Sequence, residues 1–132
     1  MKYLLDTHAL LWAVQSPQKL SGRALEIVRG DESEVLISIG TPWELAIKAN
    51  KERDKDKLDL SELLDDFERV VSGAGYEVLN ATVSHVIQAG SLPMHHRDPF
   101  DRLMAAQALA LRIPIVSCDT VFDLYGVKRI WS

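Results

Sequence analysis

Residues 2–14 decide the fold class, and they read Lys-Tyr-Leu-Leu-Asp-Thr-His-Ala-Leu-Leu-Trp-Ala-Val. The apolar run at 2–5 has the length of a buried strand, and the apolar residues that follow it recur at helical spacing. Asp6 stands between the two patterns. It is therefore predicted at the carboxyl end of a strand, directly before a helix.

The same alternation continues along the chain. Further strands are predicted at 34–39, 76–79, 113–118 and 127–131. Helical patterns separate them at 24–28, 41–49, 61–71, 82–89 and 102–111. Alternating strands and helices predict an α/β fold, a three-layer α/β/α sandwich with a mainly parallel central sheet. At 132 residues, the chain is expected to form a single domain, 1–132.

Composition limits the possible partners of the chain. Its formal net charge is −4, so no overall positive field attracts it to nucleic acid or to an anionic membrane. If the protein acts on nucleic acid, metal ions and local basic residues must supply the attraction. The single cysteine, Cys118, excludes an internal disulfide, and it is expected to be buried. The sequence has neither a signal-peptide pattern nor a run long enough to span a membrane, which predicts a cytoplasmic protein.

Three further acids occupy positions equivalent to that of Asp6. Asp119 ends the strand pattern at 113–118, whereas Glu44 and Asp101 lie where helices begin. Helices that connect parallel strands begin at the edge where the strands end. All four acids are therefore predicted at one edge of the sheet, which is where ligands bind in open α/β sheets.

Each helix-start acid also has a purely structural interpretation. Thr41-x-x-Glu44 fits a capping box, and Asp98 before Pro99 fits an N-cap with proline at the first helical position. Asp101 could simply complement the helix dipole. The coincidence of four acids nevertheless favours a functional site, because four neighbouring carboxylates repel each other unless a divalent cation binds them. Carboxylate oxygens are the ligands preferred by Mg²⁺ and Mn²⁺.

Four stretches together resemble a known family. They are 4–12 (LLDTHALLW), 42–48 (PWELAIK), 96–108 (HRDPFDRLMAAQA) and 117–122 (SCDTVF). In this combination and order they resemble the PIN-domain ribonucleases, in particular the VapC-like toxins of bacterial toxin–antitoxin pairs.

The resemblance implies a Mg²⁺- or Mn²⁺-dependent endoribonuclease that cleaves RNA. Its acidic quartet, catalytic and metal-binding, maps onto Asp6, Glu44, Asp101 and Asp119. Thr7 matches the small hydroxyl residue that often follows the first acid, and it is assigned to substrate binding. The resemblance further implies a cognate antitoxin protein that inserts near the active site, and a homodimer. The apolar helical patterns at 24–28 and 63–71 also favour a dimer, because they exceed what one sheet needs to cover it.

Basic, histidine and aromatic residues near these motifs are weaker candidates. Arg97 and Arg102 flank Asp101 near a helix start, which predicts phosphate binding. The sequence leaves the roles of His8, His95 and His96 open. Trp12 and Trp43 are expected in the core, because they sit at helical spacing among aliphatic residues.

Two other classes of function remain as alternatives. A receiver-like or phosphatase-like domain also binds Mg²⁺ at strand ends. It needs a further acid close to Asp6, where His8 stands, or at the end of the middle strand, where Asn80 stands. A catalytically silent PIN-like module would only bind a partner. The intact quartet of acids argues against that alternative.

Overall fold

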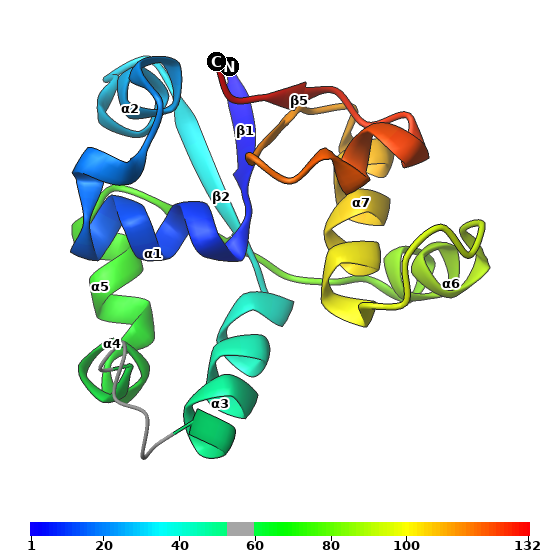
Figure 1. The fold of residues 1–132 in the computed structure, drawn as a ribbon, viewed down its shortest axis with the longest axis horizontal. Coiled ribbons are helices and arrows are strands. Elements are labelled where there is room, and N and C mark those ends of the chain that lie inside the picture. Colours follow the sequence, from blue (N-terminus) through cyan, green and yellow to red (C-terminus); the bar gives the residue numbers. More distant parts are fainter. Residues whose placement is uncertain (53–59) are drawn as a thin grey trace.

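The computed structural model describes residues 1–52 and 60–132 and contains one parallel sheet. Its five strands lie in the order β3-β2-β1-β4-β5, and all four pairings are parallel (Figure 1). The strands are β1 Lys2–Leu5, β2 Glu34–Ser38, β3 Glu77–Leu79, β4 Ile115–Val116 and β5 Arg129–Ile130. The predicted fold class, a mainly parallel sheet in an α/β/α sandwich, is confirmed.

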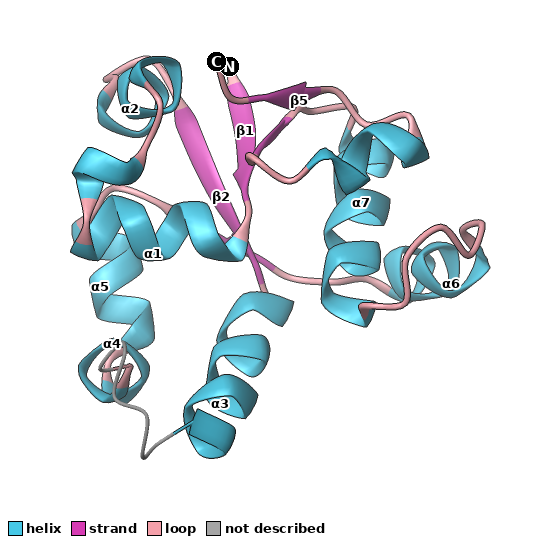
Figure 2. Cartoon of the chain, in the orientation of Figure 1, coloured by secondary structure: helices cyan, strands magenta, loops and turns pink. Residues whose placement is uncertain are grey.

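Helices connect the strands and cover both faces of the sheet (Figure 2). The α-helices are α1 Thr7–Gln15, α2 Gly22–Arg29, α3 Gly40–Glu52, α4 Ser61–Asp65, α5 Phe67–Gly73, α6 Val83–Ser91 and α7 Pro99–Leu111. Two short 3₁₀ segments are η1 Pro17–Lys19 and η2 Thr120–Tyr125. None of the helices in the described ranges is long and apolar enough to cross a membrane.

Two hydrophobic clusters lie on opposite faces of the sheet because successive strand residues point to opposite sides. Leu5 belongs to the cluster formed with α1, α2, α4 and α5. Leu4 belongs to the cluster formed with α7 and η2. Both leucines are fully buried, so β1 is covered on both faces, as expected of a central strand in a parallel sheet.

Local details differ from the sequence prediction. The predicted helix at 61–71 is divided into α4 and α5, because Asp66 leaves the helical region with φ −142° and ψ 48°. The strand predicted at 113–118 forms regular pairs only at Ile115–Val116, and Pro114 before it has no amide hydrogen to donate. Most of the mixed-sign charged stretch at 51–57 lies outside the described residues.

Two expectations about buried side chains were wrong. Cys118 is exposed, because it lies two residues beyond the end of β4, where the chain leaves the sheet. Trp43 is 64% exposed on α3, whereas Trp12 packs against the larger core cluster as expected. Trp43 contacts Phe100 edge-on, with ring centroids 5.0 Å apart.

Candidate active site

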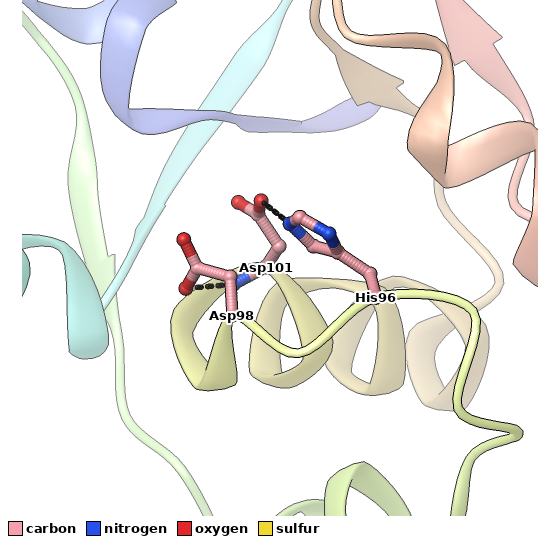
Figure 3. A group of neighbouring side chains, drawn as sticks. All are labelled: His96, Asp98 and Asp101. Atoms are coloured by element: carbon pink, nitrogen blue, oxygen red, sulfur yellow. Dashed lines mark hydrogen bonds and ion pairs between the residues drawn. The ribbon is translucent and has the colours of Figure 1, made fainter.

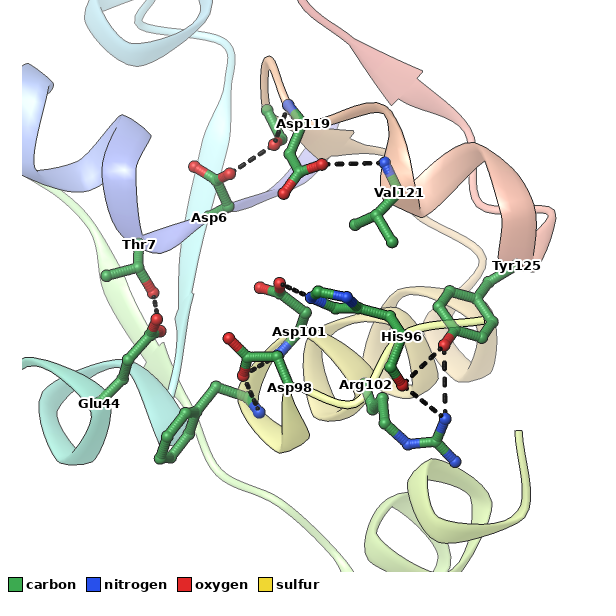
Figure 4. Close-up of polar contacts among 12 residues, drawn as sticks. Asp6, Thr7, Glu44, His96, Asp98, Asp101, Arg102, Asp119, Val121 and Tyr125 are labelled. Atoms are coloured by element: carbon green, nitrogen blue, oxygen red, sulfur yellow. Dashed lines mark hydrogen bonds and ion pairs between the residues drawn. The ribbon is translucent and has the colours of Figure 1, made fainter. Parts of the chain in front are cut away.

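Asp6 lies at the junction of β1 and α1, at the carboxyl edge of the sheet (Figure 4). It is the N-cap of α1, and its Oδ1 accepts a hydrogen bond of 2.8 Å from the amide of Ala9. Its Oδ2 accepts a hydrogen bond from the hydroxyl of Ser117. Burial raises the pKa of Asp6, the charge of Asp119 adds to this rise, and the two hydrogen bonds oppose it. The carboxylate is therefore held in a fixed orientation.

Asp119 follows β4 and is the N-cap of η2. Its Oδ1 accepts a hydrogen bond of 3.0 Å from the amide of Val121. Its own amide donates to Oγ of Ser117 at 2.9 Å, so one hydroxyl joins the backbone of Asp119 to the side chain of Asp6. Sequence reasoning missed Ser117. Its only sequence signal is a hydroxyl residue near the end of a buried strand, two positions before an acid.

Glu44 reaches the same edge from the first turns of α3. Its Oε1 accepts a hydrogen bond of 2.6 Å from the hydroxyl of Thr7. Thr41 lies inside α3, not before it, and its hydroxyl is 3.4 Å from that of Thr7, so the capping-box interpretation was wrong. Thr7 is buried and directs its proton to Glu44. The contact observed for Thr7 is thus with Glu44, and its assignment to substrate binding stays a prediction.

Asp101 lies in the first turn of α7, where His96 and Asp98 surround it (Figure 3). Its Oδ2 is 2.9 Å from Nε2 of His96. Burial, followed by the charge of Asp98 and more weakly that of Glu44, raises the pKa of Asp101 to about 7 against the opposing effect of His96. Asp98 is the N-cap of α7 and accepts from the amides of Phe100 and Asp101, so its interpretation as a cap is confirmed.

The structure thus brings the side chains of all four predicted acids to one edge of the sheet (Figure 4). They come from four different segments: the end of β1, α3, α7 and the end of β4. A divalent cation fits this donor set, because the donors are carboxylate oxygens. Burial raises the pKa of Asp6 and of Asp101, and the charge of a neighbouring quartet acid, Asp119 for Asp6 and Glu44 for Asp101, adds to each rise. His96, Asp98 and Asp101 could also contribute to such a site, since one ligand atom from each lies within 4.8 Å of the others.

Arg102 does not face this site, which contradicts its predicted role in phosphate binding. The side chain is only 6% exposed. Its guanidinium donates hydrogen bonds to the carbonyl oxygens of Gly90, Leu92, Pro93 and His96. The hydroxyl of Tyr125 also donates to the carbonyl of His96, at 3.4 Å (Figure 4). Arg102 therefore holds the segment that connects α6 to α7, and this segment carries His96.

Arg97 and the three histidines that the sequence left open differ in their contacts with the acidic site. Arg97 is exposed and lines a groove beside Glu44. His8 is exposed and its ring lies 6.0 Å from that of Trp12. His95 packs against Tyr125 with ring centroids 5.4 Å apart. Of the three histidines that the sequence left open, His96 is thus the one with a hydrogen bond to a quartet acid.

Comparison with known proteins adds to this geometry. No curated protein sequence matches the chain significantly. Among solved structures, the chain is similar to VapBC2 from Rickettsia felis, which is bound to a DNA fragment from its promoter, with 19% identity, a TM-score of 0.70 and full coverage of both chains. It is also similar to FitAcB from Neisseria gonorrhoeae, with 17% identity, a TM-score of 0.63 and coverage of 97% of this chain and 96% of the other.

A third similar structure is FitAB bound to an IR36 DNA fragment, with 16% identity, a TM-score of 0.62 and coverage of 97% and 93%. At these identities the likeness establishes the fold alone. The sequence model of the PIN domain family, in contrast, matches residues 3–128, which is nearly the whole chain. The chain therefore belongs to the PIN domain family.

Proposed function

We propose that this PIN domain is a Mg²⁺- or Mn²⁺-dependent endoribonuclease that acts as the toxin of a toxin–antitoxin pair. PIN domains are generally nucleases and typically bind divalent metals. The observation that carries the proposal is the convergence of Asp6, Glu44, Asp101 and Asp119 on one edge of the sheet, with hydrogen bonds that orient the carboxylates.

Asp6 and Asp119 are the first candidates to hold the ion, with Asp101 and Glu44 completing the donor set. A bound Mg²⁺ or Mn²⁺ would make a water molecule more acidic and would stabilise charge that develops on the phosphate. The protein's own residues supply orientation. Ser117 and the amide of Ala9 fix Asp6, Thr7 fixes Glu44, and His96 fixes Asp101.

The direct experiment is an RNA cleavage assay with the purified protein. Asp6→Asn, Glu44→Gln, Asp101→Asn and Asp119→Asn should each remove most of the Mg²⁺-dependent cleavage and keep the far-UV circular dichroism spectrum. Asp31→Asn is a matched control, because Asp31 is an exposed turn residue and its substitution should leave cleavage unchanged. Full activity of Asp6→Asn or Asp119→Asn would overturn the assignment.

Further assays distinguish RNA from DNA as the substrate, and the nuclease from a module that only binds a partner. Single-stranded RNA should be cleaved and single-stranded DNA of the same sequence should not, if the resemblance to PIN-domain ribonucleases holds. Absence of any cleavage, together with stable binding of a partner protein, would support the catalytically silent module instead. The match to the PIN family favours the nuclease over the receiver-like and phosphatase-like alternatives.

The toxin role rests on the resemblance to VapC-like toxins and is supported by the likeness in fold to VapBC2. It predicts a small adjacent gene that encodes an antitoxin. Expression of this chain alone should arrest growth, and co-expression of the adjacent gene should restore it. Arrest that persists in the Asp6→Asn variant would show that toxicity does not depend on the acidic site.

We also propose that two copies associate, but through a different surface from the one expected from sequence. The apolar residues of α2, α4 and α5, such as Ala24, Ile27 and Phe67, are buried in the core. Four exposed apolar side chains instead lie on and after α6, at Val83, Val86, Ile87 and Met94, each more than half exposed. Val86→Glu should therefore shift sedimentation from dimer to monomer, whereas Ser84→Glu, exposed on the same helix, should not.

A further inference from the structure

A groove lies between α3 and the beginning of α7, next to the acidic edge of the sheet. It has a volume of about 460 Å³, and its walls include Glu44, Lys48, Lys51, Arg97, Asp98 and Phe100. We call it the α3–α7 groove. Glu44 belongs both to this groove and to the acidic quartet, and Asp98 caps the helix that carries Asp101. The groove is therefore continuous with the candidate active site.

The groove carries three cations, Lys48, Lys51 and Arg97, against two carboxylates, Glu44 and Asp98, in a chain whose net charge is −4. Lys48 and Lys51 lie three residues apart on α3, on neighbouring positions of one helix face, while Arg97 contributes from the opposite wall. Among the side chains that the structure describes, those of 1–51 and 60–132, no ion pair involves any of the three. Cations that line a groove favour a ligand that carries negative charge.

An aromatic pair borders the same groove. Phe100 lines it, and Trp43 packs edge-on against Phe100 while staying 64% exposed. Unpaired nucleic-acid bases stack on exposed aromatic side chains of this kind. Cations that follow a backbone, combined with an aromatic platform, are the usual features of a site for single-stranded nucleic acid.

We propose that the α3–α7 groove binds single-stranded RNA on one side of the scissile phosphate. Lys48, Lys51 and Arg97 contact the phosphates of the flanking nucleotides, and Trp43 stacks on a base. This inference rests on the proposed nuclease function, because continuity with the acidic edge selects RNA over an acidic peptide as the occupant. The cations attract phosphate locally, although the chain as a whole repels it.

The inference can be tested by binding, without cleavage. The probe is a fluorescein-labelled single-stranded RNA of about 12 nucleotides, within the usual site size for such grooves. It is titrated in Mg²⁺ into protein that carries Asp119→Asn to prevent hydrolysis. In this background, Lys48→Gln with Arg97→Gln should weaken binding roughly tenfold and lower the slope of log affinity against log salt by about 0.7 per cation.

A control for the loss of two positive charges is available away from the groove. Arg112 and Lys128 line a separate cavity with Met1 and Pro114, so Arg112→Gln with Lys128→Gln makes the same change in net charge away from the groove. This pair should leave affinity nearly unchanged. Trp43→Ala should weaken binding at least about fivefold, and a duplex RNA of the same sequence should bind more weakly than the single strand.

Three outcomes would overturn the inference: equal weakening by both double variants, no weakening by the groove variants, or preference for the duplex. A wild-type protein that cleaves RNA while the groove variants bind normally would refute the groove alone. A wild-type protein that binds RNA in the groove but never cleaves it would refute the proposed nuclease and leave the groove assignment standing.

Discussion

The hydroxyl of Thr7 donates a hydrogen bond of 2.6 Å to Oε1 of Glu44, which joins the first turn of α1 to α3. The two residues are 37 positions apart in the sequence. Thr7 follows Asp6 directly, so the same backbone segment places one acid of the quartet and orients another. The contact therefore links the geometry of the two acids.

Removing the Thr7 hydroxyl should lower the rate of RNA cleavage more than it lowers the stability of the fold. Thr7→Val keeps the shape of the buried side chain but leaves Glu44 without this donor, and loss of a group that orients a metal-site acid typically costs roughly 10- to 100-fold in activity or metal affinity. Initial cleavage rates at saturating Mg²⁺ measure the effect. Thr7→Ser retains the hydroxyl and should retain most activity, so equal rates in the two variants would contradict a positioning role.

Ser117→Ala should weaken metal binding. Its hydroxyl donates to Asp6 and accepts from the amide of Asp119, and both acids are the first candidates to hold the ion. We expect the affinity for Mg²⁺ to fall roughly tenfold, as measured by calorimetric titration of metal-free protein. Ser84→Ala, on the exposed surface of α6, is the control. An unchanged Mg²⁺ affinity in Ser117→Ala would mean that Asp6 is oriented adequately by the amide of Ala9 alone.

The metal-free protein should become more stable as the pH falls. The pKa of Asp101 is raised from 3.8 to about 7 in the folded state, and that of Asp6 is also raised, chiefly by burial. Between pH 3.8 and about 7, Asp101 is ionised in the unfolded chain but still protonated in the folded one. The stability that this proton contributes is therefore complete below about pH 4 and is lost as the pH rises through about 7.

Urea denaturation in EDTA at a series of pH values measures this dependence. One pKa unit corresponds to about 1.4 kcal/mol, so even a fraction of the shift is detectable. Asp101→Asn should have a flatter profile and should exceed the wild type in stability near neutral pH. Addition of Mg²⁺ at neutral pH should stabilise the wild type more than the variant. A wild-type profile identical to that of Asp101→Asn would show that Asp101 ionises normally.

Substitution of Arg102 should destabilise the fold, whereas substitution of Arg97 should not, although both residues flank Asp101 in the sequence. Arg102→Ala leaves several carbonyl oxygens of the 90–96 segment without their donor, so the free energy of unfolding should fall by roughly 2–4 kcal/mol in urea denaturation. Arg97 is exposed, so Arg97→Ala should change stability by less than about 0.5 kcal/mol. Equal stability of the two variants would show that the Arg102 contacts contribute little.

Much of the fold could be predicted because its signals are local. The apolar run at 2–5, the acid after it and the Asp98–Pro99 helix start each depend on a few consecutive residues. The topological rule that connecting helices begin where parallel strands end then places Asp6, Glu44, Asp101 and Asp119 at one edge. No long-range information was needed for that step, and the structure brings the four together there.

The orientation of individual side chains was decided only by the tertiary structure. Successive residues of a helix point about 100° apart, so Asp101 faces the site while Arg102 turns into the protein and binds the segment before α7. Trp43 packs edge-on against Phe100 of α7 and stays 64% exposed, although its sequence pattern resembles that of a core residue.

The sequence by itself determined which carboxylates share an edge, because strand ends and helix starts are local features of the chain. Only the tertiary structure decided which groups hold those carboxylates. Ser117 and Asp6 are 111 residues apart, and Thr7 and Glu44 are 37 apart. Hydrogen bonds between such residues exist only after β1, β4 and α3 have packed, because their geometry depends on the relative placement of separate elements, which no stretch of sequence encodes alone.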